Sequence, residues 1–348
     1  MNLRKKVVVA TDGMLKLDYA KTAHGLIRGS ERFEVLAVID VDHAGSDAGE
    51  LLDGKHRNIP VVETVENAID KFGSIDYMVI GVATVGGVLS DSLHALILQA
   101  ISCGLGIVNG LHDLLGERED IVSLAMKYGI ELIDIRRPKP ITDLHFWTSE
   151  IYRVDVPIVA FLAMDCAMGK RTTARLIMEA CTDRGMNAEM IYTGQTGWMQ
   201  GSKYGFIFDS TINDFVSGEL EYAIMNCWQE EKPDLILLEG QSSLRNPSGP
   251  CGLEFLISGN AKQVILSHSP HRKHYDDDED WGVIPSVASE IEIIEKFDAK
   301  VIALALNTNG LSQEQASIYK AEYEQELGIP VVMPLEEGVE KLIDAINF

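Results

Sequence analysis

Residues 157–180 read PIVAFLAMDCAMGKRTTARLIMEA, an apolar run that passes through a short loop into a helical pattern. The loop ends with Gly169 and Lys170, the pair that closes the phosphate-binding motif G-x-x-x-x-G-K-[ST]. A helix that begins directly after a strand directs backbone N–H groups and the positive end of its dipole at a bound anion. Residues 163–173, here called the P-loop segment, are therefore predicted to bind phosphate groups.

The P-loop segment departs from the motif at two places. Five residues instead of four separate Ala163 from Gly169, and Arg171 stands where a hydroxyl normally follows the lysine. A loop that transfers phosphate uses that hydroxyl to hold Mg²⁺, whereas a second cation can neutralise a pyrophosphate that is only bound. Thr172 could still supply the hydroxyl, so both alternatives stay open. The predicted cofactor-binding residues are Asp165, Gly169, Lys170, Arg171, Thr172 and Thr173, and Lys170 is expected to be exposed at the helix N-terminus.

Short β-branched runs alternate with amphipathic stretches on both sides of this segment, a pattern typical of parallel strands joined by helices. Two α/β domains are predicted, at 1–150 and 151–348, connected through the proline-containing stretch 136–155. The expected strands are 6–10, 35–40, 77–82, 106–108 and 131–135, and then 157–163, 188–192, 234–239, 263–267, 301–306 and 330–333. The expected helices include 91–103, 113–128, 170–184, 214–230 and 311–327.

Composition limits the possible partners. The 348 residues carry a formal net charge of -23, which disfavours nucleic acids and anionic membrane surfaces. No run reaches the roughly 18 apolar residues of a membrane span, and the five cysteines form no C-x-x-C pair. A soluble cytoplasmic protein that acts on a small molecule is expected, as a homo-oligomer and without a structural metal.

Several polar residues follow predicted strands, where ligands bind in parallel sheets. Glu239 ends an apolar strand and could bind Mg²⁺ or accept a proton. Arg245 and Arg272 could pair with a substrate carboxylate.

His268, His271 and His274 lie within seven residues, and we favour anion or substrate binding over zinc for them, with His268 as a candidate general base. Lys21 and Thr22 follow the first strand and are candidate substrate-binding residues.

Eight motifs, spread over nearly the whole chain, resemble one bacterial and archaeal P-loop family. They are AKTAHGLIR (20–28), GVATVGG (81–87), NGLHD (109–113), DIRRP (134–138), the P-loop segment, TGQTG (193–197), EGQSSLRNP (239–247) and HSPHRKH (268–274). Some members of that family are D-glutamate N-acetyltransferases, and the P-loop segment is also similar to that of dethiobiotin synthetase. The resemblance implies a Rossmann-like parallel-sheet domain followed by a P-loop NTPase-like α/β domain.

The resemblance also implies a function. It favours an N-acyltransferase that uses acetyl-CoA, with cofactor phosphates on the P-loop segment, and that acetylates a small acidic amino acid such as D-glutamate. His268, ahead of Glu239, would act as the base, and Arg245, Arg272, His274, Lys21 and Thr22 would bind the acceptor. One alternative is an ATP- and Mg²⁺-dependent ligase or kinase with Thr172 and Glu239 at the metal. Another is a non-catalytic nucleotide-binding protein.

Overall fold

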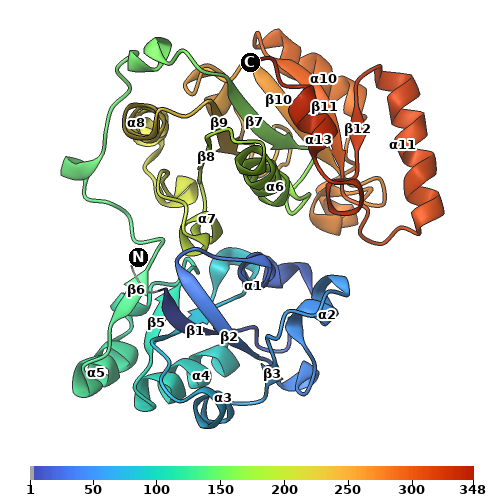
Figure 1. Cartoon of the computed structure of the whole chain (residues 1–348). Helices are drawn as coiled ribbons and strands as arrows, with labels where there is room; N and C mark the ends of the chain where they lie inside the picture. The colour runs from blue at the N-terminus through green and yellow to red at the C-terminus, as the bar shows by residue number, and fades with distance from the viewer. Residues whose placement is uncertain (1–3) are drawn as a thin grey trace. The chain divides into compact units, whose positions relative to one another are not determined.

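The computed structural model describes residues 4–348, which form two compact units (Figure 1). The first comprises the chain up to Pro138 together with Gln195–Ser202. The second comprises Lys139–Gly194 and Lys203–Phe348. A short segment of the second half of the sequence therefore belongs to the first unit, a feature that hydrophobic periodicity does not reveal.

The first unit is built on a parallel sheet of six strands in the order β3-β2-β1-β4-β5-β6. This is the strand order of a Rossmann-like fold, and it reverses between β1 and β4. The five strands expected in this half are present, and the one not expected is β3, which has only two residues and so shows no periodicity. The bounds are β1 (Lys5–Ala10), β2 (Phe33–Ile39), β3 (Val61–Val62), β4 (Tyr77–Ile80), β5 (Gly106–Asn109) and β6 (Leu132–Asp134).

Helices connect these strands, and one predicted helix is shorter than expected. The helix predicted at 113–128 begins at Glu119, because the Asp134 carboxylate accepts the N–H groups of Leu115 and Gly116 and holds the preceding residues in a loop. The helices of this unit are α1 (Lys21–Arg28), α2 (Ala48–Asp53), α3 (Val65–Phe72), α4 (Asp91–Ser102), α5 (Glu119–Tyr128) and α7 (Gln195–Gln200).

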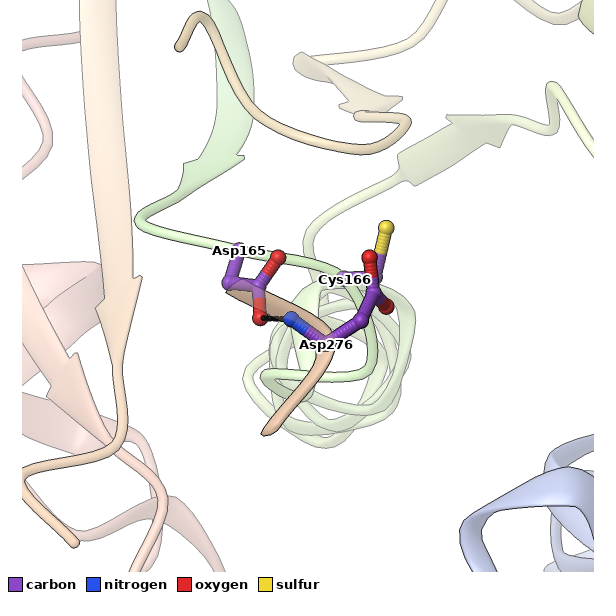
Figure 2. Close-up of side chains that lie close together, drawn as sticks. All are labelled: Asp165, Cys166 and Asp276. Carbon is purple, nitrogen blue, oxygen red and sulfur yellow. Dashed lines mark hydrogen bonds between the residues drawn. The ribbon is translucent and has the colours of Figure 1, made fainter. Parts of the chain in front are cut away.

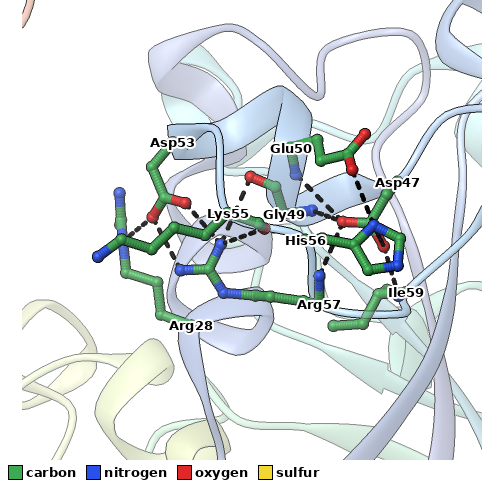
Figure 3. A network of polar contacts seen from close by, with 9 residues as sticks. All are labelled: Arg28, Asp47, Gly49, Glu50, Asp53, Lys55, His56, Arg57 and Ile59. Atoms are coloured by element: carbon green, nitrogen blue, oxygen red, sulfur yellow. Dashed lines mark hydrogen bonds and ion pairs between the residues drawn. The ribbon is translucent and has the colours of Figure 1, made fainter.

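The connection from β2 to β3 is ordered by two aspartates (Figure 3). Asp47 caps α2 and accepts four backbone N–H groups, from Gly49, Glu50, Arg57 and Ile59. Burial alone would raise the pKa of Asp47, but these donors lower it below its usual value. Asp53 pairs with both terminal nitrogens of Arg57, at 2.6 and 2.9 Å. Because these partners lie within the loop itself, the network has a structural role.

The second unit contains another parallel sheet of six strands, in the order β12-β11-β10-β7-β9-β8. Strand β7 lies between β10 and β9, so the loop that follows it is flanked by the loops after those two strands. All six strands were expected from the sequence. They are β7 (Ile158–Ala163), β8 (Ala188–Ile191), β9 (Leu235–Glu239), β10 (Gln263–His268), β11 (Lys300–Leu306) and β12 (Val331–Val332).

Alternate side chains of β7 enter two apolar clusters on opposite faces of this sheet. Val159 and Phe161 pack with the helices α6 and α13, whereas Ala160 and Leu162 belong to the cluster that includes side chains of α8, α9, α10 and α11. The bounds are α6 (Lys170–Asp183), α8 (Asn213–Glu231), α9 (Leu253–Ile257), α10 (Val287–Lys296), α11 (Gln313–Leu327), α12 (Pro334–Glu337) and α13 (Glu340–Asp344).

The stretch after Pro138 is held on α8 by two buried glutamates. Glu219 accepts from Lys139 Nζ at 2.6 Å and from the His145 N–H at 2.9 Å. Glu221 accepts the Ile151 N–H at 3.0 Å. These contacts explain why this stretch, which has no regular period, belongs to the second unit. None of the described helices is long and apolar enough to cross a membrane.

Candidate functional site

The P-loop segment adopts the predicted order of strand, loop and helix. Strand β7 ends at Ala163 and α6 begins at Lys170. Gly169 precedes the helix with φ 98, in the left-handed region where glycine carries no steric penalty. Its carbonyl oxygen accepts the Thr173 N–H at 2.9 Å, which closes the first helical turn. The backbone N–H groups of this turn are the ones that can face an anion.

Lys170 is not exposed, contrary to the expectation from the sequence. Only 7 % of the residue is accessible. Its Nζ donates to the Asp165 carbonyl oxygen at 3.0 Å and to the Ser242 carbonyl oxygen at 2.6 Å. The long side chain therefore folds back over the P-loop segment and reaches the loop after β9. The ammonium is held beside the loop instead of extending into water.

Arg171 lies against Glu239, the last residue of β9. The distance from Arg171 Nη1 to Glu239 Oε1 is 3.6 Å, and the other carboxylate oxygen accepts the Thr193 N–H at 3.1 Å. Burial raises the pKa of Glu239, opposed by Arg171, by the Thr193 N–H and by Lys170. Burial also lowers the pKa of Arg171, an effect that Glu239 opposes.

The contact between Arg171 and Glu239 bears on whether the P-loop segment binds Mg²⁺, a point that the sequence leaves open. In a magnesium-binding P-loop, the hydroxyl after the lysine holds the ion, and a carboxylate such as Glu239 is its expected neighbour. In this chain the neighbour of Glu239 is the Arg171 guanidinium, so an arginine side chain supplies positive charge beside the carboxylate. Thr172 is half-buried and Thr173 is buried, and both lie in the same first turn of α6.

Asp165 joins three loops of the second unit. Figure 2 shows one of its contacts, the hydrogen bond with Asp276. The fully buried Asp165 carboxylate accepts from Asn246 Nδ2 at 2.7 Å, from Arg272 Nη1 at 3.2 Å and from the Asp276 N–H at 2.8 Å. Arg272 also donates to the Cys166 carbonyl oxygen at 2.9 Å. Asp165 is therefore a structural anchor that holds the P-loop segment to the loops after β9 and β10.

The same place has a grouping of potential metal ligands, since atoms of Asp165, Cys166 and Asp276 lie within 4.8 Å of one another. Each oxygen of Asp165 already accepts hydrogen bonds, and one of the donors is the cationic Arg272. A metal ion would have to replace these contacts, so the geometry favours the anchoring role. Asn246 was not singled out from the sequence, because an asparagine before proline is typical of an ordinary turn.

His268 lies on the face of the sheet opposite to α6. In β10 it alternates with Ser267 and so shares a face with Val264 and Leu266, which belong to the cluster next to α11. Its Nε2 is 2.9 Å from the Tyr323 hydroxyl, while Nδ1 has no hydrogen-bond partner within residues 4–348. Burial lowers the pKa of His268 to about 4, which keeps the imidazole neutral near pH 7.

This buried imidazole makes the stability of the second unit dependent on pH. The folded pKa lies below the unfolded value of about 6.5, so the unfolded state binds more protons between these two pH values and stability is lost as the pH falls through that window. Between pH 7.5 and pH 5, His268 should remove about 2 kcal/mol from the free energy of unfolding. Chemical denaturation of the parent and of His268→Gln measures this. An equal pH dependence in both would contradict it, and the exposed His271→Gln is the control.

Two other predicted substrate-binding residues, Arg245 and His274, already have partners within the second unit. Arg245 Nε donates to Glu290 Oε2 at 2.6 Å, and its Nη2 donates to Ser289 Oγ at 2.8 Å, so α10 already engages this guanidinium. Burial raises the pKa of Glu290, and the positive charge of Arg245 opposes this rise. His274 forms an isolated antiparallel bridge with Val283. Among the described residues, the histidines of this loop belong to no group with metal-ligand geometry.

Lys21 and Thr22 lie at the start of α1 in the first unit. Lys21 is exposed, while Thr22 is buried with its Oγ1 3.0 Å from Thr196 Oγ1 in α7. In Figure 1, α7 in yellow-green lies beside α1 in blue. The motifs at 20–28 and 193–197 therefore meet, although Thr22 and Thr196 are 174 residues apart in the sequence.

The fold and the P-loop segment define a two-unit α/β protein with a Rossmann-like and a P-loop domain. Residues 145–343 match the P-loop domain of a family described as a domain of unknown function, DUF1611, and residues 41–138 match its Rossmann-like N-terminal domain. The chain belongs to this family, which confirms the resemblance inferred from the motifs.

Relatives and a solved structure agree with this assignment. A protein of Tritonibacter scottomollicae named D-glutamate N-acetyltransferase is 31% identical over 316 residues, covering 88% of this chain and 90% of that protein. A protein of the same name from Pseudoalteromonas sp is 29% identical over 276 residues, covering 76% of this chain and 79% of that protein. The crystal structure of a DUF1611 family protein from Anabaena variabilis superposes with a TM-score of 0.89 at 27% identity, covering 98% of this chain and 99% of the other.

Proposed function

We propose that the protein is an N-acyltransferase that acetylates the amino group of a small acidic amino acid from acetyl-CoA, with D-glutamate as the first candidate acceptor. The observation that carries the proposal is the contact between Arg171 and Glu239, which supplies positive charge to the P-loop segment from the chain itself. Binding of cofactor phosphates without turnover of a phosphate group needs cations but no metal ion. The names of two relatives support the same chemistry.

The donor set of the P-loop segment fits a phosphorylated cofactor. Lys170 and Arg171 would pair with the phosphate groups, and the first N–H groups of α6 would complete their hydrogen bonds. Acetyl-CoA would supply an acetyl thioester. The acceptor nitrogen must lose a proton as it forms the new C–N bond, while the C–S bond breaks and the leaving sulfur carries the electron pair away. A base of the chain is therefore required.

Of the two candidate bases, we assign this role to Glu239. It lies beside the P-loop cations, and burial raises its pKa, which makes it a better proton acceptor than an ordinary carboxylate. His268 instead contacts Tyr323 on the other face of the sheet. Arg245 and Arg272 are the proposed cations for the acceptor carboxylate, and each would have to share its five N–H donors with a carboxylate of the chain.

The test is steady-state acetyl transfer to D-glutamate, L-glutamate and D-aspartate, with and without EDTA. The parent protein should be active in chelator. Absence of acetylation of every acceptor would contradict the proposal, and ATP-dependent activity that disappears in chelator would support a magnesium-dependent ligase or kinase instead.

Arg171→Ser sharpens the test, because it places a hydroxyl beside Glu239. This variant should bind CoA more weakly in EDTA, by a factor on the order of 10 to 100, and added Mg²⁺ should recover part of the affinity. Arg184→Ser is the matched control, since Arg184 follows the other end of α6 and pairs with Asp344 at 2.9 Å. Magnesium-independent binding of unchanged strength by Arg171→Ser would contradict the role of Arg171.

A further inference from the structure

Thr193 lies just beyond strand β8, which runs beside β9 in the second sheet. The register pairs Ile191 with Leu238, so the chain two residues after Ile191 reaches the end of β9 at Glu239. Thr193 is 1 % exposed, and its carbonyl oxygen accepts the Phe208 N–H at 3.0 Å. All of these residues belong to the second unit. A buried threonine is therefore held at the end of the strand that carries the proposed base.

Two hydrogen bonds connect Thr193 to Glu239. The Thr193 N–H donates to Glu239 Oε2 at 3.1 Å, and the Thr193 hydroxyl donates to the Glu239 carbonyl oxygen at 2.7 Å. Gln241 Nε2 in turn donates to the Thr193 hydroxyl oxygen at 3.0 Å. Because a hydroxyl has a single proton to donate, these two partners fix its orientation. The Thr193 hydroxyl thus holds the main chain of Glu239, and the Thr193 N–H holds its carboxylate.

The two carboxylate oxygens of Glu239 differ in their surroundings. Oε2 accepts the Thr193 N–H within ordinary hydrogen-bond distance. Oε1 faces Arg171 Nη1 at 3.6 Å, a distance at which the charges attract each other but which is longer than that of a hydrogen bond. Glu239 is buried, so these partners limit the rotation of its carboxylate. Of the two oxygens, Oε1 is therefore the one that is left to accept a proton.

We propose that Thr193 is a positioning residue for the base: by binding Oε2, it leaves Oε1 of Glu239 to accept the proton that the acceptor amine releases as the C–N bond forms. The electron pair of the broken C–S bond leaves on the sulfur, and the proton taken up by Glu239 returns to solvent after the products leave. The inference rests on the proposed function in taking Glu239 as the base. The control of the carboxylate by Thr193 does not depend on any activity.

The contact with Thr193 has a consequence for the pH dependence of the reaction. Burial, which raises the pKa of Glu239, is opposed by three groups that face the carboxylate, namely Arg171, the Thr193 N–H and Lys170. If the Thr193 N–H moves away, the ionised form loses a hydrogen bond and the pKa of Glu239 rises further. The carboxylate is then protonated up to a higher pH, so the acidic limb of the kcat profile moves to higher pH.

Two substitutions of Thr193 separate the hydroxyl from the shape of the side chain. Thr193→Val keeps the shape and removes the hydroxyl, whereas Thr193→Ser keeps the hydroxyl. In Thr193→Val the Glu239 carbonyl oxygen and the Gln241 amide each lose a buried partner. The segment at Thr193 is then no longer tied to the main chain of Glu239, and the contact between its N–H and Oε2 should lengthen.

Steady-state acetyl transfer measures the effect on the reaction. Thr193→Val should lower kcat about tenfold, leave the KM for acetyl-CoA within about twofold, and move the acidic limb to higher pH by about one pH unit. Thr193→Ser should match the parent. Thr182→Val is the matched control, because the Thr182 hydroxyl also donates to a carbonyl oxygen, that of Met178 at 3.0 Å, near the other end of α6.

The pKa of the Glu239 carboxyl tests the geometry without any turnover. It is measured on the full chain by NMR of isotopically labelled glutamate carboxyl carbons, with the Glu239 signal identified by its absence in Glu239→Gln. The pKa should be higher in Thr193→Val than in the parent, and unchanged in Thr193→Ser and in Thr182→Val. An equal pKa in the parent and in Thr193→Val would overturn the inference, and so would an equal rise in Thr193→Ser.

Gln241→Met provides a milder perturbation if Thr193→Val does not fold, since it removes only the donor to the Thr193 hydroxyl. It should raise the pKa of Glu239 by less than Thr193→Val, and an unchanged pKa in a folded Gln241→Met protein would then overturn the inference. If the parent acetylates no acceptor while the pKa of Glu239 still responds to these substitutions, the proposed function fails and the control of the carboxylate by Thr193 stands.

Discussion

Asp165→Ala is expected to lower the free energy of unfolding by about 3 to 5 kcal/mol, the largest loss we expect from a single substitution in the site. Asp165 is fully buried, and its removal takes one acceptor from the Arg272 guanidinium and from the Asn246 amide and takes the acceptor of the Asp276 N–H. Arg272 then keeps the Cys166 carbonyl oxygen and Asn246 keeps Asp276 Oδ2. When one partner of a buried pair is removed, the other stays buried without its hydrogen bond, and this costs the free energy of removing that group from water. Asp165→Asn, which keeps an oxygen acceptor but not the charge, should lose less.

Chemical denaturation of the parent and the two variants measures these differences. Asp276→Asn is the matched control, because it leaves in place the backbone N–H that Asp276 donates to Asp165 and keeps a side-chain oxygen as acceptor for Asn246 Nδ2. That control should change stability by less than about 1 kcal/mol. If Asp165→Ala is as stable as Asp276→Asn, Asp165 does not anchor the three loops, and the metal-ligand interpretation of Asp165, Cys166 and Asp276 regains support.

Lys170→Met should weaken the proposed binding of CoA by a factor on the order of 10 to 150, the equivalent of about 1.5 to 3 kcal/mol for hydrogen bonds to a charged group. Lys170 Nζ lies over the P-loop segment, bonded to the carbonyl oxygens of Asp165 and Ser242. From this position the ammonium can pair with a phosphate group held at the N-terminus of α6. Methionine keeps most of the apolar stem and removes the charge.

Calorimetric titration with CoA gives the affinities, and thermal unfolding shows whether each variant is folded. Lys262→Met is the control, since Lys262 is half exposed and pairs with Asp298 on the surface. If the Lys170→Met protein is folded and binds CoA as tightly as the parent, the proposal that the P-loop segment binds the cofactor is contradicted.

Local patterns determined much of the architecture. The β-branched runs identify eleven of the twelve strands, because a parallel strand buried on both faces must be apolar along its whole length. Strand, loop and helix at 157–180 are also local, since Gly169 supplies the left-handed residue that the turn needs just before α6. The replacement of the hydroxyl by Arg171 is visible in the sequence, and it already raises the question of metal dependence.

Contacts between distant segments decided the rest, because no local period records which partner a polar side chain will meet. Glu239 pairs with Arg171 because β9 lies next to β7 in the sheet. Asn246, Arg272 and Asp276 meet at Asp165 because the loops after β9 and β10 flank the loop after β7. A turn residue such as Asn246 looks ordinary until that order is known.

The sequence by itself determined two α/β units, the P-loop segment and the family, since apolar periodicity and short motifs are properties of neighbouring residues. Tertiary structure alone decided that Arg245 meets Glu290, that His268 meets Tyr323 and that α7 belongs to the first unit. The physical reason is the same in each case. A buried polar group must find a hydrogen-bond partner, and the strand order, together with the packing of helices on the sheets, determines which partner lies within reach.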